Sequence, residues 1–189
     1  MNKKAKAILD FWFIKTSPEE KFNRNDEFDK KIKDLFLEDY KKATNNEYDY
    51  WQESAEECLA LIVLLDQFSR NLFRNDPKAF AMDYKAQAIA KNAINRNYHK
   101  LLSNNYILFI FLPLMHSEEL DDQLQCNKLI DEYLKDNKNY KEISKFTNIH
   151  LDIIKKFGRF PYRNKVLKRK NTKKENDYLN STHHGFFNI

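Results

Sequence analysis

Glycine and proline are scarce in this chain: its 189 residues include 2 Gly and 4 Pro. Average usage would give roughly 13 glycines, and the tight turns of β-hairpins depend on glycine. The shortage excludes a hairpin-rich β fold and leaves few interruptions for long helices. A chain of this length most often forms one domain. We predict a single all-α domain over residues 1–180, a bundle or superhelix of about seven to eight helices, and a loosely ordered tail over 181–189.

Cysteine and long apolar runs are also scarce. Cys58 and Cys126 lie far apart and form no CxxC pair, which is typical of small buried residues in a reducing compartment. The N-terminal apolar run is interrupted by Asp10 and lacks a small-residue cleavage site, so no signal peptide is expected. No stretch approaches the ~20 apolar residues of a membrane span. We therefore expect a cytoplasmic protein without a membrane anchor.

The sequence lacks the short motifs that mark a metal or cofactor site. It contains no phosphate loop and no GxGxxG. His116, Glu118, His150 and Asp152 are suitable metal ligands, but they have no recognised metal-binding spacing. The sequence therefore predicts no metal and no cofactor.

Acidic residues are absent from one segment, 155–174, which holds ten Lys or Arg residues. This segment accounts for the net charge of +5, so the basic character is local. Basic and aromatic residues alternate here, which is a feature of nucleic-acid-binding surfaces, but no nucleic-acid-binding signature accompanies them. Nucleic acid is not the expected partner.

The most apolar stretch of the chain, Ser54–Arg74, predicts a central helix. Ser54 and Glu57 are spaced as a capping box, and the apolar residues that follow cover nearly the whole circumference of a helix. The stretch then ends in a polar cluster: Asp66, Gln67, Arg70, Asn71 and Arg74. At spacings of three and four these residues form either an ion-pair ladder at a helix end or a pair of forked arginines that hold an anion, with Asp66 fixing one of them.

Periodicity and capping signals predict the other helices. They are expected at 3–14, at 26–43 capped by Asp26, at 77–95 after the N-cap Asp76, at 106–115 interrupted by Pro113, at 117–135 capped by Ser117, at 140–157 ended by Gly158, and after the Thr172–Glu175 capping box. In the helix 77–95 we expect Phe80, Tyr84, Ala88 and Ala90 to face inward.

Two further polar blocks carry candidate functional residues. His116-Ser117-Glu118 follows the helix that Pro113 interrupts. His116 is either a hydrogen-bonded core residue or, with Glu118, a general acid–base pair; Ser117 is a cap rather than a nucleophile, because no GxSxG surrounds it. The segment 150–164 brings His150 and the polar residues Arg159, Arg163 and Asn164, which form either a solvated basic loop or one wall of a polar site.

Five segments together resemble a known family. They are LDFWF (9–13), LALIVLLDQFSRNLFR (59–74), DPKAFAMD (76–83), FLPLMHSEELDDQ (111–123) and HLDIIKKFGRFPYRN (150–164). In order and spacing they are similar to the largely bacterial domain-of-unknown-function family 924, over about residues 8–179. The resemblance implies an all-α, right-handed superhelical, tetratricopeptide-like fold and no established activity. The family usually has Leu-Gly-Arg where this chain has Leu167-Lys168-Arg169, so the path of 165–172 is left open.

Two functions are compatible with these features. In the first, the polar clusters converge on a pocket for a small anionic ligand bearing a phosphate or carboxylate, either for binding alone or for catalysis as well. The expected catalytic residues are His116, Glu118 and His150, and the expected ligand-binding residues are Asp66, Gln67, Arg70, Asn71, Arg74, Arg159, Arg163 and Asn164. In the second, a tetratricopeptide-like groove binds a partner peptide and the polar clusters are structural. The sequence does not decide between them and does not indicate an oligomeric state.

Overall fold

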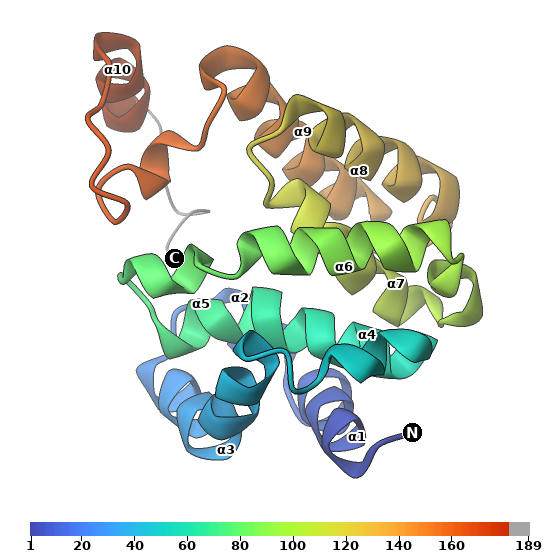
Figure 1. The fold of residues 1–189 in the computed structure, drawn as a ribbon. Helices are drawn as coiled ribbons and strands as arrows, with labels where there is room; N and C mark the ends of the chain where they lie inside the picture. Colours follow the sequence, from blue (N-terminus) through green and yellow to red (C-terminus); the bar gives the residue numbers. More distant parts are fainter. Residues whose placement is uncertain (182–189) are drawn as a thin grey trace.

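The structure, a computed structural model, describes residues 1–181, and within them the chain is all-α (Figure 1). The α-helices are α1 (Lys3–Leu9), α2 (Pro18–Phe22), α3 (Asp26–Thr44), α4 (Ala55–Ile62), α5 (Ser69–Leu72), α6 (Asp83–Asn95), α7 (Asn104–Met115), α8 (Leu120–Tyr133), α9 (Tyr140–Phe157) and α10 (Lys173–Ser181). Two π-helical turns, η1 (Asp10–Ile14) and η3 (Val63–Phe68), and four 3-10 turns, η2 (Asp49–Glu53), η4 (Pro77–Phe80), η5 (Tyr98–Leu101) and η6 (Pro161–Arg163), complete the order.

The apolar stretch predicted to be central is the buried axis of the molecule. Helix α4, the π turn η3 and α5 follow one another without leaving helical geometry, and form one rod. Helix α3 packs against α5 and η3, α1 against α4, and α6 and α7 against α4 (Figure 1). The rod's side chains from Leu59 to Leu65 are fully shielded from solvent. Because an all-round apolar helix can only be stable in the interior, the sequence pattern alone placed it correctly.

Counting that rod as one helix, residues 1–181 contain nine separate helices rather than the expected seven or eight. The all-α fold class is confirmed, whereas the tetratricopeptide-like superhelical arrangement stays a prediction. The tail expected to be loosely ordered, 181–189, lies outside the described residues except for Ser181, the last residue of α10. Within the described residues, no helix combines the length and the apolar character needed to cross a membrane.

Two predicted N-caps are wrong by a small shift. Asn25, not Asp26, caps α3, because its side chain accepts hydrogen bonds from the backbone N–H groups of Glu27 and Phe28. Helix α8 begins at Leu120, later than the expected 117. Ser117 still organises this turn: its hydroxyl accepts from the Glu119 N–H and donates to Asp122 at 2.7 Å.

Helix α6 begins six residues later than expected, which rotates its inward face. Asp76 and Pro77 start the 3-10 turn η4 instead of the α-helix. Tyr84, expected inside, is therefore 67% exposed, and Ala88 is exposed as well. The buried face consists of Ala86, Ile89, Ala90, Ala93 and Ile94.

The segment after α9 wraps back toward the rest of the molecule. Gly158 ends α9 with φ of 68°, the left-handed conformation that glycine adopts without steric cost. The chain then makes the turn η6 and a loop that leads into α10, which stands at one edge of the fold (Figure 1). Thr172 and Glu175 form the predicted capping box for α10. In the loop, Lys168 adopts φ of 55°, in the left-handed region that favours glycine.

Candidate functional site

Asp66 lies at the centre of the polar network, at the point where the rod changes from α- to π-helical geometry. The π turn η3 carries it on a buried stretch, and its side chain is 1% exposed. It accepts hydrogen bonds from His116 Nδ1 at 2.8 Å, from Gln67 Nε2 at 2.6 Å and from Arg70 Nη2 at 3.4 Å. Single π turns inside α-helices frequently occur at functional sites.

The electrostatics of Asp66 keep it ionised. Burial by itself raises its pKa, but the charge and hydrogen bond of His116, followed by Arg70 and Gln67, outweigh burial and lower the pKa to about 2. An ionised carboxylate can only accept hydrogen bonds, so Nδ1 of His116 carries a proton. The other ring nitrogen, Nε2, has no hydrogen-bond partner among the described residues.

Arg70 and Arg163 share a second carboxylate, Asp83, at the start of α6. Arg70 binds Asp83 end-on through Nη1 at 2.7 Å and Nη2 at 3.1 Å, and its Nη1 also donates to the carbonyl of Ala79. Nη1 of Arg163 donates to Asp83 Oδ2 at 3.3 Å. Asp66, Arg70, Asp83, His116 and Arg163 therefore form one connected network, which we call the Asp83 cluster.

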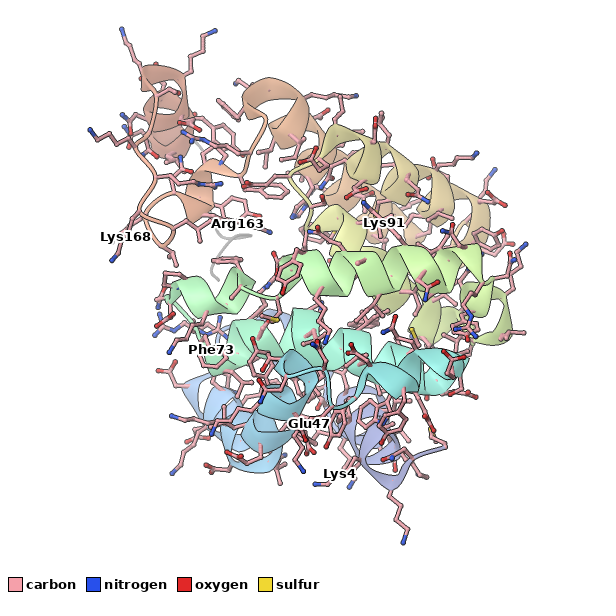
Figure 2. All side chains as sticks on the ribbon, viewed as in Figure 1. Lys4, Glu47, Phe73, Lys91, Arg163 and Lys168 are labelled. Atoms are coloured by element: carbon pink, nitrogen blue, oxygen red, sulfur yellow. The ribbon has the colours of Figure 1, made fainter. Side chains whose placement is uncertain are left out.

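Arg163 is the unusual member of this cluster. It is 4% exposed and lies over three aromatic rings, 4.5 Å from the ring centre of Phe160, 4.8 Å from that of Phe80 and 5.8 Å from that of Tyr162. Figure 2 shows its label between the C-terminal segment and the α6 side of the fold. Two of its nitrogens, Nε and Nη2, are buried and have no hydrogen-bond partner of acceptable geometry among residues 1–181. The Tyr162 side chain lies close to the guanidinium, whose charge and hydrogen bond oppose the rise that burial gives the pKa of Tyr162.

Glu118 fixes the basic loop beside this cluster. It accepts from the backbone N–H of Phe160 at 2.8 Å and from Arg169 Nη1 and Nη2 at 2.7 and 3.0 Å. Burial raises the pKa of Glu118, but the hydrogen bonds from Arg169 and Phe160 outweigh it, so the pKa lies below its usual value. Glu118 is thus occupied by Arg169 and Phe160, and the carboxylate that positions His116 is Asp66, which the sequence-based hypothesis had not paired with it.

An open hollow of about 330 Å³ lies over the Asp83 cluster. It is lined by Pro77, Phe80, Ala81, Asp83, Tyr84, Gln87, His116, Glu118, Arg163 and Leu167. Three of the eleven residues predicted from the sequence, His116, Glu118 and Arg163, line it directly. Asp66 and Arg70 lie behind them, and Gln67 is bonded to Asp66.

The remaining predicted residues lie elsewhere or bind other partners. Arg74 and Asn71 both bind Asp29 of α3, and we call these three residues the Asp29 cluster. Arg74 thus meets a different carboxylate from Arg70, which binds Asp66 and Asp83, because η3 breaks the α-helical spacing and α5 ends at Leu72.

Three further predicted residues, two in the segment after α9 and one within α9, do not line the hollow. Arg159 binds Glu175 and the carbonyl of Lys170, and Asn164 bonds to Asn171 and Arg169. His150 is buried against Phe160, with its Nδ1 2.8 Å from the Phe146 carbonyl. Burial above all lowers the pKa of His150, to about 4, so it is neutral at pH 7.

Sequence reasoning missed Asp29, Asp83 and Arg169, each of which holds a predicted residue in place. Asp83 is the last residue of the block DPKAFAMD, whose pattern predicts the start of a helix but does not mark Asp83 as a site residue. Asp29 and Arg169 lie in charged segments that gave no distinguishing signal. Among the described residues, no group of three or more His, Cys, Asp or Glu side chains could hold a metal ion.

These features define an all-α protein with a buried Asp–His–Arg network beneath an open hollow. A solved structure has a similar fold: that of a protein of unknown function from Agrobacterium tumefaciens has a TM-score of 0.86 and 35% sequence identity, covering 94% of this chain and 97% of that one. No curated protein matches the sequence. The model of a bacterial protein family of unknown function, DUF924, matches residues 8–183. The chain belongs to the DUF924 family.

Proposed function

We propose that the hollow binds a small anionic ligand, bearing a carboxylate or a phosphate, through the Nε and Nη2 groups of Arg163. The observation that supports this most is the absence of a described partner for these two buried donors. A buried donor left unsatisfied costs about 1–3 kcal/mol, and a buried charged one costs more. Both donors are also shielded from solvent, so an anion in the hollow reaches them only when the side chains around Arg163 shift. A ligand oxygen at each position then removes that cost.

Arg163 is held in place before the ligand arrives. Its third donor group is engaged by Asp83 and its guanidinium plane is packed against Phe80 and Phe160. Little side-chain freedom is therefore lost on binding, and preorganisation of this kind increases affinity. Arginine suits this task because its planar fork matches the spacing of the oxygens of a carboxylate or phosphate.

His116 supports a catalytic role for the same site. Asp66 fixes one ring nitrogen as a proton donor, and the imidazole ring lines the hollow with Nε2 available. A histidine in this arrangement can take a proton from, or return it to, a bound molecule at neutral pH. In this proposal His116 transfers the proton and Asp66 orients the ring. Glu118 holds the basic loop through Arg169 and Phe160, and His150 packs against Phe160.

Ligand-induced thermal stabilisation tests the proposal. The full chain is melted with a panel of small carboxylates and phosphates, as wild type and as Arg163→Gln. A ligand present at 100 times its Kd raises the free energy of unfolding by about 2.7 kcal/mol, so a binder should raise the Tm of wild type and leave that of Arg163→Gln unchanged.

A matched control comes from the other end of α6. Arg96 caps that end and pairs with Glu53 at the surface, about 20 Å from Asp83 along the helix axis. Arg96→Gln makes the same chemical change and should keep the ligand-induced shift. A panel in which no compound raises the Tm of wild type contradicts the proposal.

The interaction-module alternative is favoured by a different surface. Leu120 and Leu124, one turn apart on α8, are 44% and 45% exposed, and solvent-facing leucines in adjacent turns are typical of helix-docking faces. In that case the Asp83 cluster is structural. Arg163→Gln would then change the stability of the protein but no small-molecule affinity, and Leu124→Ser would weaken partner binding.

A further inference from the structure

We infer that the ligand of the hollow is a monocarboxylic acid with an apolar body, rather than a phosphate. The inference rests on the proposed function and narrows it to one chemical class. Three observations support it: the carboxylates bound by the Nε–Nη2 edge of other arginines in this chain, the charged residues at the hollow, and the apolar residues that line the rest of it.

Three arginines of the chain can be compared through the edge formed by Nε and Nη2. In Arg74 this edge holds the two oxygens of Asp29, at 2.6 and 2.9 Å. In Arg159 it holds the two oxygens of Glu175, at 2.7 and 2.8 Å. In Arg163 the same pair of donors is the one without a described partner. A side-on carboxylate completes Arg163 in the way that the chain's own carboxylates complete Arg74 and Arg159.

The charges at the hollow favour a single negative charge on the ligand. Two carboxylates, Asp83 and Glu118, line it together with Arg163. Asp83 is shared by Arg70 and Arg163, and Glu118 is bound by Arg169. A monoanion replaces a missing partner of Arg163, whereas a phosphate dianion brings a second charge close to two carboxylates. Like charges held at short range repel one another.

The rest of the lining suits an apolar body. Pro77, Phe80 and Leu167 contribute apolar surface, and Tyr84 adds an aromatic ring. The ring of Phe80 is also stacked beneath the guanidinium groups of both Arg70 and Arg163, which fixes its orientation. The volume, about 330 Å³, is at the low end of the ~300–1,000 Å³ range of small-molecule sites. A ligand that places its carboxylate on Arg163 can cover this surface with an aryl or short alkyl group.

Three probes separate the parts of the inference by titration calorimetry on the full chain at pH 8. Phenylacetate carries one charge and an apolar body, acetate carries the charge without the body, and phenyl phosphate carries the same ring with a dianion. We expect phenylacetate to bind with a Kd at least ~10-fold lower than that of either other probe, a difference of about 1.4 kcal/mol. Inorganic phosphate is run in parallel.

Two variants assign the effect to the named residues. Arg163→Lys keeps the charge but removes the fork, and it should lose phenylacetate binding at least ~10-fold. Leu167→Ser should weaken phenylacetate while leaving the affinity for acetate unchanged, because only the body contacts Leu167. Arg96→Gln should change neither affinity.

The outcomes distinguish the inference from the proposed function. Phenyl phosphate or inorganic phosphate binding more tightly than phenylacetate, and losing that binding in Arg163→Lys, overturns the inference and keeps the anion site. Equal affinity for acetate and phenylacetate overturns the apolar-body part. Absence of binding by all four probes to the folded wild type overturns both.

Discussion

Two ion-pair clusters lie at the same end of the central rod and use its residues differently. In the Asp29 cluster, Arg74 offers its Nε–Nη2 edge and Asn71 its amide, and Asp29 of α3 accepts from both. In the Asp83 cluster, two arginines share one carboxylate and Arg163 keeps an edge unfilled. The first cluster is complete without a ligand and joins α3 to the rod. The second is incomplete in itself, and this is the property expected of a binding site.

Of the changes that separate the two clusters, removal of Arg70 should lower the free energy of unfolding most. Arg70→Met leaves the buried Asp66 and Asp83 with fewer compensating charges, and breaking such a buried pair costs about 3–5 kcal/mol. Arg74→Met deprives only one carboxylate, Asp29, of its cation, and Asn71 still donates to it, so this variant should cost less. Urea unfolding of both variants measures the difference. Equal losses would show that the two clusters are energetically equivalent.

Acid should lower the free energy of unfolding through His150. Its folded pKa of about 4 lies below the ordinary histidine pKa of 6.5, so the unfolded chain binds the proton more readily. The stabilisation is complete above pH 6.5 and is lost as the pH falls toward 4, by about 3 kcal/mol in total.

Urea midpoints between pH 7 and pH 4 measure this slope, and His150→Gln should flatten it. Asp66 acts in a separate window: its folded pKa of about 2 is below 3.8, so its stabilisation is lost only as the pH falls from 3.8 toward 2. A slope between pH 6.5 and 4 that is unchanged in His150→Gln would contradict the assignment.

Neutralising one charged residue in each cluster should cause smaller losses of unfolding free energy, and their ranking tests the contrast between the clusters directly. Asp29→Asn weakens the hydrogen bonds to Arg74 and Asn71 and should cost about 1–3 kcal/mol. Arg163→Gln removes a buried charge that already has two unmet donors, so without ligand it should cost less than about 1 kcal/mol. Chemical denaturation at pH 7 ranks the two. A larger loss in Arg163→Gln supports a structural role for Arg163 instead of binding.

The smallest expected effect is a gain, in the loop that carries Leu167. Lys168 has φ of 55°, and a residue with a Cβ is strained there. Lys168→Gly should stabilise the fold by about 0.5–1 kcal/mol. Lys165→Gly, in the same turn but without positive φ, is the matched control and should give no gain. Thermal unfolding of the two variants decides whether the loop path is as described.

The elements that were predicted well depend on short-range signals. Ser54 caps α4 through the Glu57 N–H, Gly158 ends α9, and Thr172 with Glu175 starts α10. Each of these interactions joins residues within four positions of one another, so it can be predicted from the local sequence. The predicted inward face of α6 is wrong because the chain first forms a 3-10 turn at Pro77 and the α-helix begins only at Asp83. A periodicity that starts at Pro77 therefore selects the wrong side chains.

The candidate site was predicted only in part, because its bonds join distant segments. Asp66 and His116 are 50 positions apart, and Asp83 and Arg163 are 80 apart. The three polar blocks contributed residues to one network, but no pattern in the sequence indicated that Asp29 binds Arg74 or that Glu175 binds Arg159. Choosing among many carboxylates for each arginine requires the packing of the helices.

The sequence by itself determined that the chain is helical, that 54–74 is its interior axis and where most helices begin and end, because periodicity and capping act over one or two turns. Only the tertiary structure decided which carboxylate meets which arginine. Helix packing brings α3 to Arg74 and returns the C-terminal segment to Asp83, and it satisfies one arginine fork completely while leaving the other without a described partner.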